Sequence, residues 1–300
     1  MTDYNNAHLF MEPETQQYGN HMVMTNVHKP VKSKHVNIDT KFRDDYDYTQ
    51  PASFNVSIPE RLNEVRSIQV TNVEIPMSFY NISSTLGNNY LKITNGANTE
   101  LITVSDNQYN SATLNAEIAT KLNASTYGAN ITIIVTENSK TVISTTETIT
   151  IDFAVDKYGN NDKFNFKHKL GWFIGFRKTT YAVTTATSIV SECIADLSGP
   201  RYLYLAIDEF NKGNQNNFVS PLSSSMNNKN IIARIAMDSV KYPYGSILPA
   251  NKYGLLFSDI RGYTGKIDLQ KLHVSLLNET GIPMMLNGND FSFCIEAICE

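Results

Sequence analysis

Cysteines are scarce in this sequence, and basic residues are not concentrated anywhere. Only three cysteines occur among 300 residues, and none has the CxxC spacing of a zinc site. An odd number of unclustered cysteines is typical of free thiols in a reducing compartment. Lys and Arg are scattered as singles and the formal net charge is −4, which argues against the basic surface of a nucleic-acid-binding protein. We therefore expect free thiols and no direct contact with nucleic acid.

Long apolar runs are also missing. No stretch approaches the roughly 20 apolar residues that a helix needs to span a bilayer. The first residues, MTDYNNAHLFMEPETQQYGN, have neither the basic nor the apolar region of a secretory signal. The sequence thus predicts a protein that is made and kept in the cytosol and has no transmembrane segment.

Motifs for catalysis or cofactor binding are lacking as well. There is no GxSxG sequence, and RGYTGKID (residues 261–268) has its glycines and lysine too close together for a phosphate loop. Asp208 and Glu209 are adjacent in an apolar stretch, so on a strand they would point to opposite faces. Four histidines lie in the first 35 residues without the short spacings of a metal site. We expect no enzyme, no cofactor and no metal ion.

Aromatic and β-branched residues are abundant instead. The chain has 16 Tyr and 14 Phe, and apolar residues alternate with polar ones from residue 53 onward. A slip in this alternation near Arg66 predicts a bulge between two paired strands. The sequence NGANTE predicts a hairpin turn, and helical spacing predicts one amphipathic helix over residues 111–122. We expect roughly ten strands and one or two short helices, an all-β, single jelly-roll-like β-sandwich over residues 36–300.

The first 35 residues do not follow this pattern. They are rich in Asn, Gln, Met and His and show no sustained apolar period. Such a segment cannot build a core of its own. We predict an extended N-terminal arm over residues 1–35 that becomes ordered against neighbouring subunits, and a second contact segment in the polar loop of residues 211–230.

The arm meets the sandwich at HVNIDTKFRDDYDYTQPASFNVSIPE (residues 35–60), which is rich in acids and aromatic rings. We interpret it as a structural clasp in which Arg43 bonds to Asp39 or to a nearby backbone carbonyl, with aromatic rings packed beneath. The predicted clasp and interface residues are Asp39, Phe42, Arg43, Asp44, Tyr46 and Tyr48. An alternative is a metal-dependent enzyme whose ion is held by Asp39, Asp44, Asp45 and Asp47, although the order of ligands in a calcium loop is absent.

Several phrases occur in an order that resembles a known family. They are VNIDTKFRDDYDYTQPASFNVSIPERLNEVRSIQVTNVEIPMSFYNIS, KLGWFIGFR, RYLYLAIDEFN, NIIARI and GYTGKIDLQKLHVSLLNETGIPMMLNGNDFSFCIEA. Over residues 34–299 the chain resembles minor capsid or penton-type virion proteins of nucleocytoplasmic large DNA viruses. The resemblance implies an architectural jelly roll placed among the trimers of a major capsid protein.

The resemblance also implies partners and a location. The partners would be the major capsid protein and other minor capsid proteins, and a homopentamer at the fivefold vertices is one arrangement that it allows. The location would be the virion capsid, assembled in the host cytoplasm. A different function is a glycan-binding jelly roll that uses exposed Tyr242, Tyr244 and Tyr253.

Overall fold

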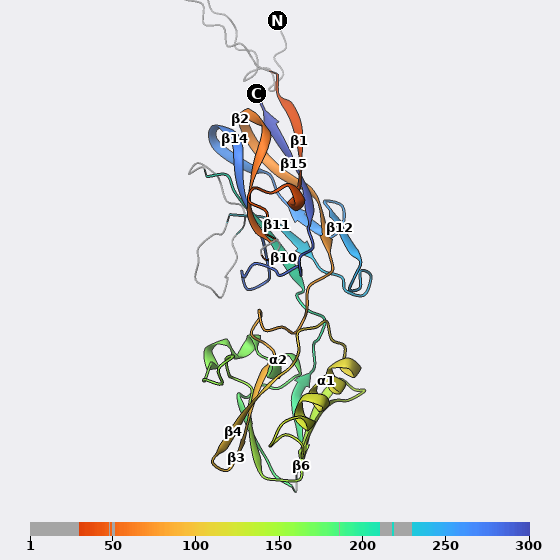
Figure 1. Cartoon of the computed structure of the whole chain (residues 1–300). Coiled ribbons are helices and arrows are strands. Elements are labelled where there is room, and N and C mark those ends of the chain that lie inside the picture. Colours follow the sequence, from red (N-terminus) through yellow and green to blue (C-terminus); the bar gives the residue numbers. More distant parts are fainter. Residues whose placement is uncertain (1–29, 48, 50–51, 186, 211–217, 219–229) are drawn as a thin grey trace, which may run out of the picture.

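The structure is a computed structural model of the chain that describes residues 30–47, 49, 52–185, 187–210, 218 and 230–300. It is built mostly from curled antiparallel sheets, so the predicted all-β, jelly-roll-like fold class is confirmed. Figure 1 shows an elongated molecule with an upper part, which contains the start of β1 and the end of β15, and a lower part, which contains the helices α1 and α2.

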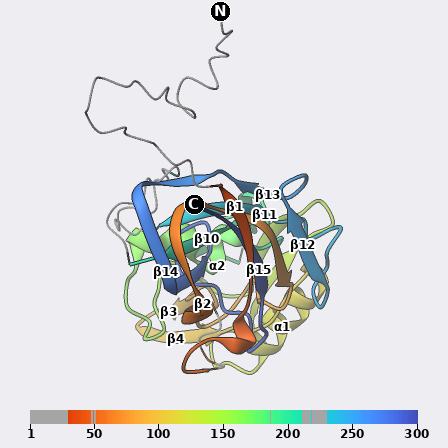
Figure 2. The same cartoon turned by 90° about the horizontal axis from the view of Figure 1, so that it is seen from above.

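The upper part is one sheet of eight strands. Seven follow the order β1-β15-β2-β14-β10-β11-β13, and β12 pairs with β2 off this path. Viewed from above, these strands curl around a common interior (Figure 2). The strands are β1 (Lys32–Asp39), β2 (Ser53–Pro76), β10 (Tyr202–Asp208), β11 (Ile231–Ala236), β12 (Ile247–Asn251), β13 (Leu256–Ser258), β14 (Arg261–Leu277) and β15 (Ser292–Cys299).

Strand β2 is one continuous strand of 24 residues, so the prediction of two paired strands in this region is wrong. The predicted bulge is confirmed, because the pairing of β15 with β2 passes from Ser67 to Val65 and leaves Arg66 unpaired. Glu64 has a positive φ of 55° at the same place. The kinked strand therefore changes direction without ending, and its two halves line different regions of the same core.

The core of the upper part consists of the inward-facing residues of these strands. In β2 they include Phe54, Val56, Val65 and Val73, all of which are buried. A buried Val or Phe side chain contributes about 1.5–3 kcal/mol relative to an exposed one. The alternation that predicted strands is thus the alternation between this core and the surface.

The lower part contains two smaller sheets and a separate hydrophobic cluster. One sheet has the order β4-β3-β7-β8 and the other has the order β5-β6-β9. The elements are β3 (Tyr90–Asn95), β4 (Asn98–Thr103), α1 (Ser111–Asn123), β5 (Ile131–Val135), β6 (Lys140–Thr145), β7 (Ile149–Asp152), the 3-10 helix η2 (Lys163–His168), α2 (Leu170–Phe173), β8 (Thr180–Val183) and β9 (Ile189–Ile194).

The predicted helix and hairpin are both confirmed. Helix α1 begins after Asn110, whose side chain accepts a hydrogen bond from the backbone of Thr113 in a capping box. Its face of Leu114, Ile118 and Leu122 is buried. The hairpin joins β3 to β4 in register. Among the described residues, none of the helices has the length and apolar character needed to cross a membrane.

The predicted division at residue 35 lies inside an observed strand. Strand β1 begins at Lys32 and pairs with β15 along its whole length, while residues 1–29 and most of the predicted contact loop 211–230 lie outside the described residues. That residues 36–300 form one domain stays a prediction, and the structure shows two major hydrophobic clusters within that range.

Gly175 allows β9 to lie against the chain that follows α2. It has a positive φ of 97°, and a Cβ atom there would lie 2.2 Å from the backbone oxygen of Cys193. Gly96, in the β3–β4 turn, has a positive φ of 60° but open space around it. We expect Gly175→Ala to lower the free energy of unfolding by about 3 kcal/mol and Gly96→Ala by about 1 kcal/mol. Denaturant unfolding of both variants measures this, and equal losses would show that the close contact is unimportant.

Candidate functional site

The segment between β1 and β2 is held by a buried arginine. The 3-10 helix η1 (Thr40–Phe42) follows β1, and the side chain of Arg43 behind it is only 1% exposed. Its Nη1 atom donates to the carbonyl of Thr40 at 2.7 Å and to the carboxylate of Asp290 at 2.6 Å. Its Nη2 atom donates to the carbonyl of Asp47 at 2.6 Å. We call residues 40–47 together with Asp290 the clasp.

Further contacts surround the same carboxylate. The hydroxyl of Thr40 donates to Asp290 at 2.7 Å, and the backbone N–H of Phe291 donates to that hydroxyl at 3.0 Å. The Tyr46 ring lies under the guanidinium of Arg43, 3.9 Å from the ring centre. Because the charge of Arg43 is both paired and hydrogen-bonded, its burial is compensated. The clasp fastens the chain after β1 to the loop that precedes β15.

Only some of the predicted clasp residues make the contacts that were predicted for them. The predicted carbonyl partners of Arg43 are present, but Asp39 instead accepts a hydrogen bond from the backbone of Lys41 at 2.9 Å and caps η1. Asp44 accepts from the hydroxyl of Ser57 at 2.8 Å. Tyr48 lies outside the described residues.

The expectation that Phe42 packs beneath the clasp is wrong, since its side chain is 79% exposed. It sits at the end of η1, the turn that directs Arg43 inward. Asp290, the carboxylate that completes the clasp, was missed by sequence reasoning. It lies 247 residues from Arg43, and no local pattern connects the two.

The four predicted acidic ligands, Asp39, Asp44, Asp45 and Asp47, do not assemble into a metal site. Hydrogen bonds already engage several of them, and those from Thr49 to Asp47 hold the pKa of that carboxyl below its usual value. Within the part of the chain that the structure describes, no group of three or more His, Cys, Asp or Glu side chains is placed to hold a metal ion. The metal-dependent alternative therefore has no support from this arrangement.

The three tyrosines of the glycan-binding alternative do not form a common platform. Tyr244 stacks on Tyr80 with ring centres 6.3 Å apart, while Tyr242 is half-buried against the upper core. Tyr253 is the most exposed of the three. Among the ring contacts of the described residues, none joins two of these three tyrosines, so the arrangement does not favour a sugar-stacking surface.

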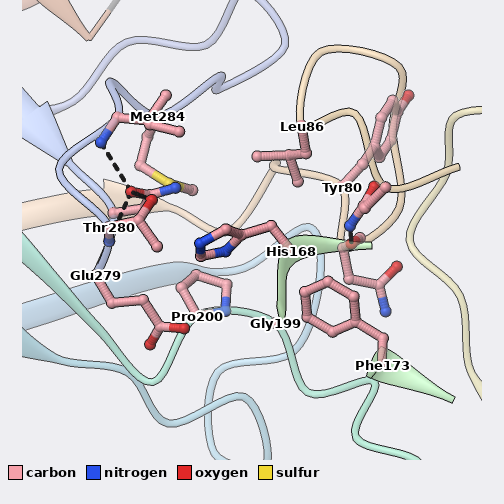
Figure 3. Close-up of a pocket in the computed structure, with 13 residues that line it drawn as sticks. Tyr80, Leu86, His168, Phe173, Gly199, Pro200, Glu279, Thr280 and Met284 are labelled. Atoms are coloured by element: carbon pink, nitrogen blue, oxygen red, sulfur yellow. Dashed lines mark hydrogen bonds between the residues drawn. The ribbon is translucent and has the colours of Figure 1, made fainter. Parts of the chain in front are cut away.

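A pocket of about 80 Å³ lies where the upper and lower parts meet (Figure 3). Tyr80 and Leu86 line it from the chain after β2, and His168 and Phe173 from the lower part. The loop after β14 contributes Asn278, Glu279, Thr280, Ile282 and Met284. Figure 3 shows the imidazole of His168 near the centre, between that loop and the rings of Phe173 and Tyr80. The pocket therefore joins segments that are distant in sequence.

The polar groups of this pocket mostly support its walls. The side-chain oxygen of Asn278 accepts from the backbone N–H groups of Thr280 and Ile282, and Asn81 donates to two backbone carbonyls. Burial holds the pKa of His168 below its ordinary value, and the nearby carboxylate of Glu279 opposes this effect. The pocket is thus a small, largely apolar junction that contains one titratable imidazole.

A second buried arginine lies in RGYTGKID, at the start of β14. Arg261 donates to Glu209 at 2.7 Å and to the carbonyls of Ile207 and Asn230 at 2.8 and 2.6 Å. The hydroxyl of Tyr263 donates to Glu209 at 3.0 Å; burial and this carboxylate raise the pKa of that phenol. The spacing of this motif excludes a phosphate loop, and the ion pair of Arg261 with Glu209 was not predicted from the sequence. The only sign of this ion pair in the sequence was a single arginine at the start of an alternating strand.

Comparison with known proteins gives a family without an assigned activity. Residues 23–252 match a family described as a family of unknown function (DUF5901). The chain belongs to this family. The match begins at residue 23, inside the predicted arm. This is eleven residues before the start of the resemblance to virion proteins, which covers residues 34–299. No curated protein matches the chain.

Among solved structures, the chain is similar to the crystal structure of SeMet-labelled mavirus penton protein. The sequence identity is 10% and the TM-score is 0.44. The match covers 90% of this chain and 99% of the mavirus protein.

We expect Arg43→Ala to lower the free energy of unfolding by about 3–5 kcal/mol, because it leaves the nearly buried carboxylate of Asp290 without its cation. The matched control is Arg61→Ala, which breaks the exposed ion pair between Arg61 and Asp268 and should change stability little. Denaturant unfolding of both variants tests this. Similar midpoints for the Arg43 variant and the unsubstituted protein would contradict a stabilising clasp.

His168 should make stability depend on pH. Its pKa in the folded protein lies below the ordinary value of 6.5, so the unfolded chain binds a proton more readily. This contribution to stability is present above about pH 6.5 and is lost as the pH falls through the lowered pKa. Melting temperatures across this range should therefore fall less in His168→Gln than in the unsubstituted protein. Parallel pH profiles would show that the imidazole does not titrate differently on folding.

Proposed function

We propose that this protein is a structural component of an icosahedral virion, a penton or minor capsid protein, whose activity is binding. The observation that carries the proposal is the way the chain enters its fold. All eight residues of β1 pair with β15, and the buried ion pair of Arg43 with Asp290 holds the segment that follows β1 in place. Residues before Pro30 are thereby attached to a rigid edge of the upper sheet, as a protein that reaches neighbouring subunits requires.

The character of the surface also supports a binding role. Large apolar side chains are exposed on both parts of the molecule, including Phe42 and Val240 on the upper part and Phe164 on the lower. Exposed aromatic side chains held on rigid turns are typical anchors of protein interfaces. Meanwhile the buried charges Arg43 and Arg261 are used to close loops, as described above, and are not presented to a substrate.

The phrases shared with virion proteins of nucleocytoplasmic large DNA viruses suggest the partners. In this proposal the protein contacts the major capsid protein and other minor capsid proteins in a capsid that is assembled in the host cytoplasm. A ring of five copies at a fivefold vertex would require contacts between two different faces of the chain. A specific position would bury more than about 1,000 Å². In the capsid the protein acts by binding and does not catalyse a reaction.

The copy number in purified particles tests this function. We expect a fixed ratio of this protein to the major capsid protein, unchanged by further purification, because each copy occupies a defined position in the lattice. Quantitative mass spectrometry with labelled peptides of both proteins measures the ratio, and an abundant non-structural viral protein serves as the control. A ratio that falls with each purification step, as for the control, would contradict the proposal.

A further inference from the structure

The lower part carries a projecting turn whose backbone is tightly fixed. The carboxylate of Asp156 accepts from the backbone N–H groups of Tyr158 and Asn160 at 2.8 and 2.9 Å. The backbone N–H of Asp162 donates to the carbonyl of Ala154 at 2.7 Å and closes the base of the turn. Helix η2 (Lys163–His168) follows at once, beside α2 (Figure 1). We call residues 156–167 the basic turn.

Two aromatic rings of the basic turn face solvent. Tyr158 is 74% exposed and Phe164 is fully exposed. The neighbouring Phe166 is buried and packs edge-on against Trp172, with ring centres 5.8 Å apart. Phe164 therefore projects from a turn that is anchored from beneath.

The same twelve residues carry three lysines against two aspartates. Lys157, Lys163 and Lys167 are exposed, and within the described part of the chain none of them forms an ion pair. Of the two acids in the turn, Asp162 pairs with Lys169 at 2.6 Å, while Asp156 accepts the backbone hydrogen bonds of the turn and keeps its negative charge. The basic turn is thus locally positive in a protein whose net charge is −4.

We propose that the basic turn docks on the surface of a lipid bilayer with anionic headgroups. Exposed aromatic rings enter the boundary between headgroups and acyl chains, while lysines extend their charged ends toward the phosphates. Tyr158 and Phe164 supply the rings, and the three lysines supply the charge that complements an anionic surface. This function is separate from the capsid role and does not depend on it.

Vesicle flotation of the full chain tests the docking. We expect the protein to float with phosphatidylcholine vesicles that contain phosphatidylserine and to remain at the bottom with phosphatidylcholine alone. Phe164→Ser should abolish most of the binding. Lys163→Gln and Lys167→Gln should each lower the partition coefficient roughly fivefold, and added salt should weaken binding of the unsubstituted protein.

Phe42→Ser is the matched control. Phe42 is also an exposed phenylalanine on a 3-10 turn, but two aspartates follow Arg43 directly in its sequence. The Phe42→Ser substitution should leave vesicle binding unchanged. Equal melting temperatures of the two serine variants show that folding is intact. Absence of binding to anionic vesicles, equal loss in both serine variants, or binding only to RNA or to an acidic protein would overturn the proposal, whereas the copy number in particles would be unaffected.

Discussion

Strand β2 is the element on which the upper sheet depends. One edge of this strand binds β14 along its first part and β12 at its end, and the other edge binds β15. The remaining strands attach through these neighbours, β1 to β15 and β10 to β14. Because β2 then continues directly into Met77 and Tyr80, the same strand also sets where the lower part begins. The bulge at Glu64 and Arg66 lies where the pairing of this 24-residue strand with β15 begins.

Two buried arginines, Arg43 and Arg261, each fix a connection between strands with the same set of hydrogen bonds. Arg43 donates to two main-chain carbonyls and the carboxylate of Asp290, and Arg261 donates to two main-chain carbonyls and the carboxylate of Glu209. The first closes the turn between β1 and β2, and the second joins the end of β10 to the start of β11. A guanidinium suits this use because its donors are fixed in a planar fork and it stays charged when buried. Lysine would offer a compact ammonium without that fork.

Local features were predictable from the sequence and distant pairings were not. The helical spacing of α1, the turn between β3 and β4 and the slip at Arg66 are encoded within a few residues, and the structure contains all three. The partner of Arg43 is Asp290, and no pattern in a single sequence relates positions so far apart. The aromatic residue Phe42 was expected inside because of its type, but the direction of η1 decides its exposure. Separation into two major hydrophobic clusters likewise depends on which strands pair, since both parts have the same alternation.

The antiparallel pairing of β1 with β15 has a mechanical consequence. Lys32 pairs with Cys299 and Asp39 with Ser292, so the strand axis runs from the free end of the upper part toward its interior. If the residues before β1 are pulled along this axis while the lower part is held, the tension acts parallel to the strands. All eight pairs then share the force in shear, and Arg43 resists sliding at the far end. The same tension applied across the strands would open the pairs one after another, so the attachment is strong in one direction of loading and weak in the other.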